Sequence, residues 1–286
     1  MKTFYVDSIN GNDSNDGLTK ETALKTFDSI FLQNKYKNVL EEDVTIYLNP
    51  KGKYTYSKEA FTVTQQTTSY SNRFNYVTRI LSYSEKLAEI VIPDFSNESS
   101  MPSNSNVFYS SHQDIRLTNL KIIGFYMTVG GTSESSRLSA TNCFFEGFGS
   151  KYNIKYGNSS SAAYSAYTNC IFKNYNLIAV GKLTNCTLIN IDTIDTQYTF
   201  YNYYGTITNS VYSNVAKLLN HTKTTNTYVV DNDITDNVYT KDVNGITYGA
   251  TLKFYSDIIK ELVKNAILNH KLISNHVLTV EIESEE

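Results

Sequence analysis

Tryptophan is absent from the 286 residues, and proline and cysteine each occur only three times. Three cysteines without paired metal-ligand spacing predict neither a disulfide framework nor a zinc site. The formal net charge is −3, so the chain lacks the basic surface on which nucleic-acid binding depends. It also lacks a run of about 18 apolar residues, so we expect no membrane insertion. We expect no cofactor and no bound metal.

A secretory leader is also missing at the start of the given sequence. Residues Met1 to Asp7 follow a strand pattern at once, without an apolar segment or a small-residue cleavage site. We therefore expect a protein that is made in the cytoplasm and does not leave by that export route.

Tyrosine is abundant, with 24 residues, and asparagine, serine and threonine are dense throughout. Tyrosine and the β-branched residues favour strands, whereas asparagine and serine favour turns. The composition therefore predicts β structure with many short turns.

Six segments share Thr-Asn followed by a strand-like alternation. Their asparagines are Asn119, Asn142, Asn169, Asn185, Asn209 and Asn226, at spacings of 23, 27, 16, 24 and 17 residues. A constant short strand with variable spacing is typical of a β solenoid, because loops between rungs can grow without disturbing the stack. The repeat predicts an all-β fold, a right-handed parallel β-helix.

Two columns of the repeat are expected to point into the core, because positions two apart share one face of a strand. They are Leu120, Cys143, Cys170, Cys186, Ser210 and Thr227, and then Ile122, Phe145, Phe172, Leu188, Tyr212 and Val229. The cysteines are thus interpreted as small buried apolar residues. The repeated asparagine is expected at a corner. A second turn is expected, since Gly and Asn tolerate positive φ, at Gly124, Gly147, Asn174, Asn190 and Asn214.

Both ends of the coil are predicted to carry other elements. We predict a first strand, loop and capping helix over 1–43, the β-helix over 44–240, and a C-terminal helix and tail over 241–286. The first helix is predicted to start near Thr19 or Thr22, because apolar residues follow at helical spacing. The second is predicted from about Leu252 to His270, as a cap or an oligomer contact, and a last strand is predicted over 276–282.

The segment from Tyr5 to Phe27, with its GNDSNDG loop and TALKTF motif, resembles the beginning of the pectate-lyase-like parallel β-helix superfamily. The Thr-Asn repeats fit the rungs of the same superfamily, and the resemblance covers roughly residues 3 to 235. It implies a fold rather than an activity, because the superfamily includes lyases, hydrolases, epimerases, adhesins and bacteriophage tail spikes. Without a leader, the resemblance favours a tail spike, fibre or baseplate protein, a class that is often trimeric and directed at surface glycans.

Motifs for chemistry are few. Asn12, Ser14 and Asp16 alternate as in part of a calcium loop, but Ala23 stands where the distal glutamate would be, so a plain turn is favoured. Asp192 and Asp195 are the candidates for a catalytic carboxylate pair. No lyase or polygalacturonase-like motif accompanies them, so the sequence leans against an enzyme.

One segment is rich in side chains that suit carbohydrate binding. Its aromatic residues are Tyr198, Phe200, Tyr201, Tyr203 and Tyr204, with Asn202 among them. Aromatic faces stack on sugar rings, and amides bond to hydroxyl groups. The alternative is a rung whose tyrosines fill or shield the core.

Three hypotheses for the function follow from the sequence. The first is a structural virion protein, a homotrimer that assembles with other virion or tail proteins and contacts a host surface glycan. The second is a carbohydrate-active enzyme, a polysaccharide lyase or glycosidase. The third is a surface adhesin exported by another route.

Overall fold

The computed structural model describes residues 2–32, 43–57, 59–60, 77–94, 114–129, 137–156, 165–179, 181–195, 197–198, 203–204, 206–219, 228–231 and 239–252. The chain divides into one compact unit, Met1–Leu252, and a second unit, Lys253–Glu286. The C-terminal helix and last strand that the sequence predicts beyond Leu252 lie outside the described residues. No helix in the described ranges is long and apolar enough to cross a membrane.

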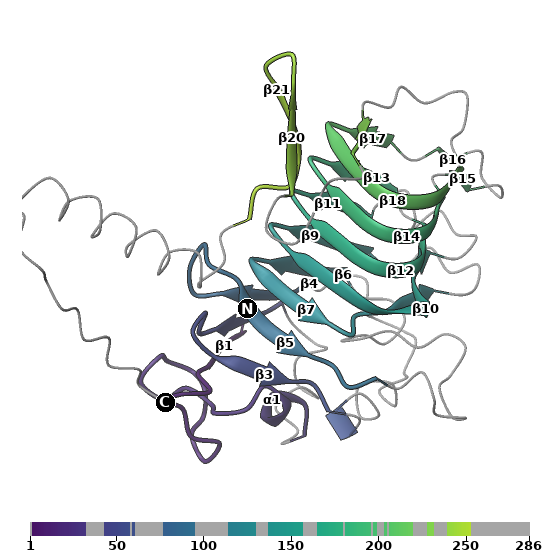
Figure 1. Cartoon of the computed structure of the whole chain (residues 1–286). Helices are drawn as coiled ribbons and strands as arrows, with labels where there is room; N and C mark the ends of the chain where they lie inside the picture. Colours follow the sequence, from purple (N-terminus) through teal and green to yellow (C-terminus); the bar gives the residue numbers. More distant parts are fainter. Residues whose placement is uncertain are drawn as a thin grey trace, which may run out of the picture. The chain divides into compact units, whose positions relative to one another are not determined.

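Two long parallel sheets build the first unit (Figure 1). Sheet A contains, in spatial order, β1 (Lys2–Val6), β2 (Val44–Leu48), β4 (Val77–Ser82), β6 (Asp114–Thr118), β9 (Arg137–Thr141), β11 (Ala166–Thr168), β13 (Lys182–Thr184) and β17 (Thr206–Thr208). Sheet B contains β3 (Lys53–Thr55), β5 (Ala88–Val91), β7 (Leu120–Ile123), β10 (Phe144–Tyr156), β12 (Ile171–Ala179), β14 (Thr187–Asp195), β18 (Ser210–Leu219) and β19 (Tyr228–Val230), and β8 (Met127–Val129) also pairs with β10. From β2 to β18, apart from β8, the strands of these two sheets alternate between sheet A and sheet B along the chain, and every neighbouring pair in them is parallel. This arrangement is a parallel β-helix, as predicted.

Five successive rungs turn their first corner at the repeated asparagine. Asn119, Asn142, Asn169, Asn185 and Asn209 all have φ between 48° and 55°. This left-handed conformation is costly for most residues and is tolerated by asparagine. The side-chain amides of these asparagines also form hydrogen bonds from one rung to the next. Asn169 Nδ2 donates to Asn142 Oδ1 at 2.8 Å, and Asn142 Nδ2 donates to Asn119 Oδ1 at 3.0 Å. The predicted asparagine corner is confirmed at these five positions, and Asn226 lies outside the described residues.

A second corner divides the long strands of sheet B. Asn174 in β12, Asn190 in β14 and Asn214 in β18 have φ of 61°, 53° and 51°. Parallel pairing continues past these bends, where Ile191 of β14 lies between Tyr175 and Val215. The second halves of the strands therefore form a third face of the coil.

The predicted inward columns form the core except at the last repeat, where Val229 is only half-buried and Thr227 lies outside the described residues. Leu120, the three cysteines and Ser210 are fully buried, and so are Ile122, Phe145, Phe172 and Leu188. Burial raises the pKa of the Cys170 thiol well above its ordinary value and raises the pKa of Cys186 to about 12. These thiols therefore stay protonated and inert near neutral pH, as the interpretation of the cysteines requires.

The predicted start of the first helix is wrong. The helix α1 (Asp28–Leu32) begins several residues after Thr19 and Thr22, which lie in turns. The Asp13 carboxylate accepts bonds from the backbone N–H groups of Lys25 and Thr26, at 2.9 and 2.8 Å. Such side-chain acceptors compete with helix formation and hold this stretch in an extended turn.

The neighbouring loop over residues 10–17 is closed by its own side chains. Asn12 Oδ1 accepts from the backbone N–H of Ser14, and Asp16 Oδ1 accepts from that of Leu18, each at 3.0 Å. The oxygens that alternate as in a calcium loop are thus used within the turn.

A C-terminal segment, residues 239–252, covers part of the outer surface of sheet B and is called the strap below. It contains the antiparallel hairpin of β20 (Thr240–Val243) and β21 (Ile246–Gly249). Its backbone N–H groups donate hydrogen bonds to three rungs. Gly249 donates to the backbone oxygen of Asn209, Ala250 to Thr187 Oγ1, and Thr251 to Asn169 Oδ1. Strand alternation places one column of side chains on the outer face of sheet B. These side chains are buried because the strap covers them: Phe144, Ile171, Thr187 and Val211.

The asparagine corner generates a prediction about stability. Asn142→Ala should lower the free energy of unfolding by about 3 kcal/mol. It removes two side-chain hydrogen bonds, and it leaves a residue with a Cβ atom at positive φ without the hydrogen bonds that offset the cost of that conformation. Asn142→Gly should lower it by about 1 kcal/mol less, because glycine removes the bonds but accepts the conformation. Urea unfolding followed by circular dichroism measures both values.

The matched control is Thr141→Ala, which changes an exposed neighbour on the same rung and should alter stability by less than about 0.5 kcal/mol. Equal stability of the alanine and glycine variants at position 142 would contradict the role of the backbone conformation.

Candidate functional site

The rung that contains β10 departs from the regular coil. Glu146 pairs with Lys173 of β12, but the next pair is Gly149 with Tyr175, so two residues of β10 stand opposite one of β12. The register shifts again before Asn153. The bend of this rung falls at Gly149, whose φ is 99°, and the predicted turn at Gly147 is therefore displaced by two residues. Such β-bulges bend a strand and redirect its side chains.

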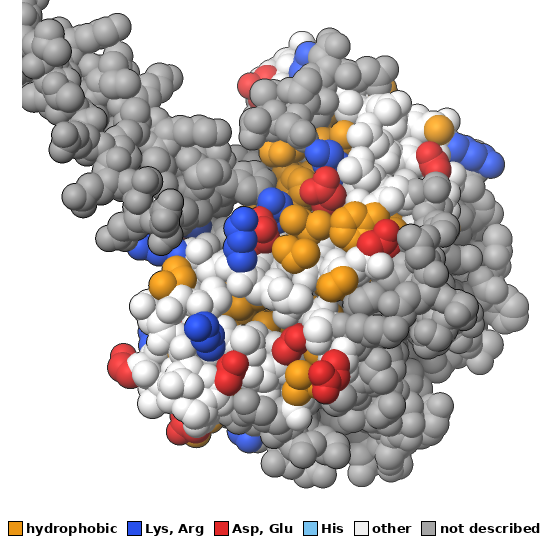
Figure 2. All heavy atoms as spheres, turned by 60° about the horizontal axis from the view of Figure 1, so that its bottom comes forward, with side chains coloured by type: hydrophobic (Ala, Val, Ile, Leu, Met, Phe, Trp, Pro, Cys, Tyr) orange, Lys and Arg blue, Asp and Glu red, His pale blue; other side chains and the backbone are white. Residues whose placement is uncertain are grey.

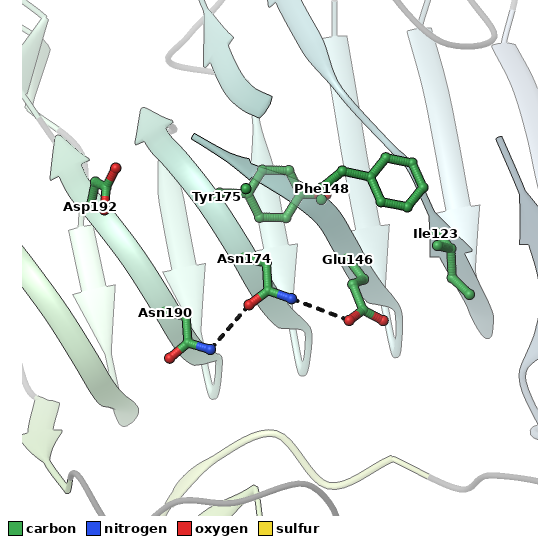
Figure 3. A pocket seen from close by; sticks show the side chains of 9 residues that line it. Ile123, Glu146, Phe148, Asn174, Tyr175, Asn190 and Asp192 are labelled. Atoms are coloured by element: carbon green, nitrogen blue, oxygen red, sulfur yellow. Dashed lines mark hydrogen bonds between the residues drawn. The ribbon is translucent and has the colours of Figure 1, made fainter. Parts of the chain in front are cut away.

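A hollow with a volume of about 580 Å³ opens on the outer surface beside this bulge (Figure 3). It is lined by residues of β7, β10, β12 and β14: Ile123, Glu146, Gly147, Phe148, Gly149, Asn174, Tyr175, Asn190 and Asp192. Its size is within the range of about 300–1,000 Å³ that is common for small-ligand sites. We name it the Glu146 hollow.

The base of the Glu146 hollow has no room for a larger residue at position 147. A Cβ atom on Gly147 would lie 2.6 Å from the carbonyl oxygen of Asn174 and 3.0 Å from atoms of Tyr152 and Tyr175. The Tyr175 ring is buried, and its hydroxyl donates to the backbone oxygen of Phe125 at 2.9 Å. Burial raises the pKa of this hydroxyl well above its ordinary value, so Tyr175 is a structural donor and cannot exchange protons near neutral pH.

One wall of the hollow is an exposed aromatic ring. Phe148 is 44% exposed, although most large apolar side chains of the described core are buried. Its ring meets that of Tyr152 edge-on, with centroids 5.2 Å apart and planes at 88°. Tyr152 is itself buried and donates to Asp94 Oδ1 at 2.8 Å. These contacts fix the Phe148 ring while leaving part of its surface open to solvent.

A line of hydrogen bonds crosses the hollow from rung to rung. Asn214 Nδ2 donates to Asn190 Oδ1 at 2.8 Å, and Asn190 Nδ2 donates to Asn174 Oδ1 at 3.0 Å. Asn174 Nδ2 then donates to Glu146 Oε1 at 3.3 Å, as the dashed lines of Figure 3 show for the last two bonds. The amides all point the same way, so the line ends on the carboxylate. Lys173 Nζ also lies 3.6 Å from Glu146 Oε1.

The structure places the two predicted carboxylates differently. Asp192 is exposed and lines the Glu146 hollow, on β14 beyond the bend at Asn190 (Figure 3). Asp195 ends β14, where its backbone pairs with Ala179 and Leu219, and its side chain is outside the described part of the structure. Asp192 is thus joined by Glu146, which the sequence did not single out.

The tyrosine-rich segment leaves the coil. Residues Gln197–Tyr198 (β15) and Tyr203–Tyr204 (β16) pair antiparallel, with Tyr198 opposite Tyr203. A rung of the parallel coil is therefore excluded for these residues. Their side chains are outside the described part, as are Phe200, Tyr201 and Asn202, so their predicted part in carbohydrate binding stays a prediction.

The sequence did carry a signal for the site. The longest spacing between repeated asparagines, 27 residues, separates Asn142 from Asn169. The extra residues begin with the two glycines that follow Glu146. An insertion with glycines in an otherwise regular repeat indicates a bulge, and that bulge forms the hollow.

No family model and no curated protein matches the sequence. Among solved structures, the chain is similar to a GH136 lacto-N-biosidase from Eubacterium ramulus, at 12% identity and a TM-score of 0.36, over 80% of this chain and 55% of that one. It is also similar to a rhamnogalacturonan lyase, at 12% identity and a TM-score of 0.27, over 80% of this chain and 67% of that one. The chain thus spans about half the length of the lacto-N-biosidase.

The two similar structures are named as enzymes, a lacto-N-biosidase and a lyase. The leaning against an enzyme is corrected, because it rested on the lack of a contiguous motif. The physical reason lies in the coil. Side chains that share a site on a β-helix come from successive rungs, as Glu146 and Asp192 do here, so no contiguous motif is needed. The absence of such a motif was not evidence against catalysis. Neither name points to a virus particle, and the virion assignment stays a prediction.

The close packing at Gly147 generates a second prediction. Gly147→Ala should lower the free energy of unfolding by about 1–3 kcal/mol, because its Cβ collides with backbone and ring atoms that cannot move independently. The urea midpoint should fall with little change in the slope of the transition.

Gly245→Ala is the matched control, since Gly245 lies in the turn of the strap, where nothing comes within 4 Å of an added Cβ. Its φ of 78° leaves only the backbone cost of about 1 kcal/mol. A smaller decrease in the free energy of unfolding for Gly147→Ala than for Gly245→Ala would show that the residues at the base of the hollow shift at little cost to make room for the added methyl group.

Proposed function

We propose that the Glu146 hollow binds a glycan chain. The observation that carries this proposal is the exposed Phe148 ring beside a line of carboxylate and amide groups in one concave surface. An aromatic face packs against the apolar face of a sugar ring, and the polar groups bond to its hydroxyls.

The amide line suits a chain that runs along the coil. Successive rungs are about 4.8 Å apart, a spacing comparable with one sugar unit of a polysaccharide. Each hydrogen bond between neighbouring rungs uses one of the two N–H donors of a side-chain amide. Asn174 and Asn190 thus have further bonding capacity at repeated intervals, and Glu146 and Asp192 provide acceptors at the two ends.

A second candidate function is cleavage of that glycan. The observation that favours it is the presence of two carboxyl groups, Glu146 and Asp192, in the same hollow. Glycoside hydrolysis needs one carboxyl group to protonate the leaving oxygen and a second to activate water or to attack the sugar. Both residues come from different rungs, and the Glu146 side chain is held by Asn174.

The biological setting that we propose rests on the sequence resemblance. It is a homotrimeric virion component that acts with other tail proteins and meets a host surface glycan. Native mass spectrometry tests the oligomeric part of this proposal, since a stable monomer argues against a trimeric spike or fibre.

The proposed function is tested by glycan binding. The full chain should be retained on at least one class of immobilised polysaccharide, and Phe148→Ala should weaken that binding about tenfold because stacking area is lost. Affinity electrophoresis through polysaccharide gels measures the change. Release of new reducing ends, if observed, should be lost in Glu146→Gln and in Asp192→Asn while binding persists.

Ile246→Ala is the matched control for Phe148→Ala. Ile246 is 47% exposed on the strap hairpin and does not line the hollow, so its loss should leave binding unchanged. Equal weakening by both variants would locate the binding elsewhere, and an absence of retention on every polysaccharide would reject the proposal.

A further inference from the structure

The lining of the Glu146 hollow has charge of one sign. Its two charged side chains are the carboxylates Glu146 and Asp192, and none of the residues that line it is lysine, arginine or histidine. Its remaining polar groups are the amides of Asn174 and Asn190. A ligand in the hollow therefore meets an acidic surface with neutral donors between the acidic groups.

Two described lysines lie close to this lining without being part of it. Lys173 lies beside Glu146, with Nζ 3.6 Å from Oε1, and its side chain is only 17% exposed. Lys217 is exposed on β18, where its backbone pairs with Thr193. The charge within the lining itself therefore comes from Asp192 and from Glu146 with its lysine partner. The lower rungs of sheet B carry a similar pair, Lys121 Nζ with Glu89 Oε2 at 2.8 Å.

The described residues form no continuous basic surface on the face that Figure 2 draws. On the face drawn in Figure 2, acidic and basic side chains are interspersed among the coloured residues, around a central group of hydrophobic side chains. Several of the described cations are engaged by neighbouring carboxylates, as Arg79 is by Asp43 at 3.1 Å and Arg116 by Asp114 at 3.0 Å. Steering of a polyanion depends on unpaired positive charge.

We infer that the glycan bound by the Glu146 hollow is uncharged, with hydroxyl or N-acetyl groups, and is not a uronate polymer. This inference rests on the proposed function and narrows it to a substrate class. A uronate chain brings one negative charge per sugar unit, and each unit that enters the hollow faces Asp192 in a lining that holds no lysine, arginine or histidine. A neutral or N-acetylated sugar has hydroxyl and amide groups that pair with Glu146, Asn174 and Asn190 at no electrostatic cost.

The test compares two forms of one polymer, galacturonan before and after methyl esterification, beside neutral and N-acetylated polysaccharides. We expect retention on neutral or N-acetylated chains, and binding of the esterified galacturonan about tenfold tighter than that of the free acid at low salt. The difference should shrink at about 0.5 M NaCl, because salt screens exposed charges.

Asp192→Asn should reduce the preference for the ester, and Asp192→Lys should reverse it. The matched control is Asp242→Asn, which makes the same change in net charge at an exposed position on the strap and should leave the preference unchanged. This comparison separates the local field from the net charge of the protein.

The outcomes distinguish the two proposals. Tighter binding of the free acid, or a preference for it after calcium is added, overturns the inference but leaves glycan binding in place. Retention on none of the polysaccharides overturns the proposed function and the inference together. A preference for the ester that Asp192→Asn and Asp242→Asn reduce equally also overturns the inference.

Discussion

The need to turn a strand through a sharp corner within one residue governs this fold. From β6 to β18 the rungs stack with the same left-handed backbone at the first corner of each. Asparagine meets this need because it tolerates positive φ and because its amide bonds to the asparagine of the next rung. The hydrogen bonds between the asparagine side chains offset the cost of the left-handed backbone, and that cost recurs at each of these corners.

The candidate site depends on a rung of the described coil in which this regularity fails. In the β10 rung the corner moves to Gly149, and the extra residues bring Phe148 to the surface. The regular rungs above keep their asparagines in line, so the amide line ends beside the displaced strand, at Glu146. An irregular rung between regular ones thus produces an aromatic wall and a polar base in one hollow. Neither feature would arise from the repeat alone.

The sequence predicted what depends on periodicity. The core columns, the asparagine corners and the parallel coil all follow from residues that recur, and each is present in the structure. It predicted poorly where side chains bond across loops. The first helix starts late because Asp13 reaches forward to Lys25 and Thr26. The sequence did not predict a role for Glu146, because its partners, Lys173 and Asn174, are adjacent in space but far along the chain. Only the unusual spacing of the repeated asparagines indicated that this rung is irregular.

The strap has a consequence for how the coil comes apart. A stack of rungs ordinarily frays from its ends, because each rung contacts only its neighbours. The strap bonds to Asn169, Thr187 and Asn209, and its bond to Asn169 spans 82 residues of sequence. Rungs β12 to β18 are consequently tied lengthwise as well as edge to edge, so the last of them cannot separate until the strap has been released. The upper part of the coil therefore opens as one cooperative block rather than turn by turn.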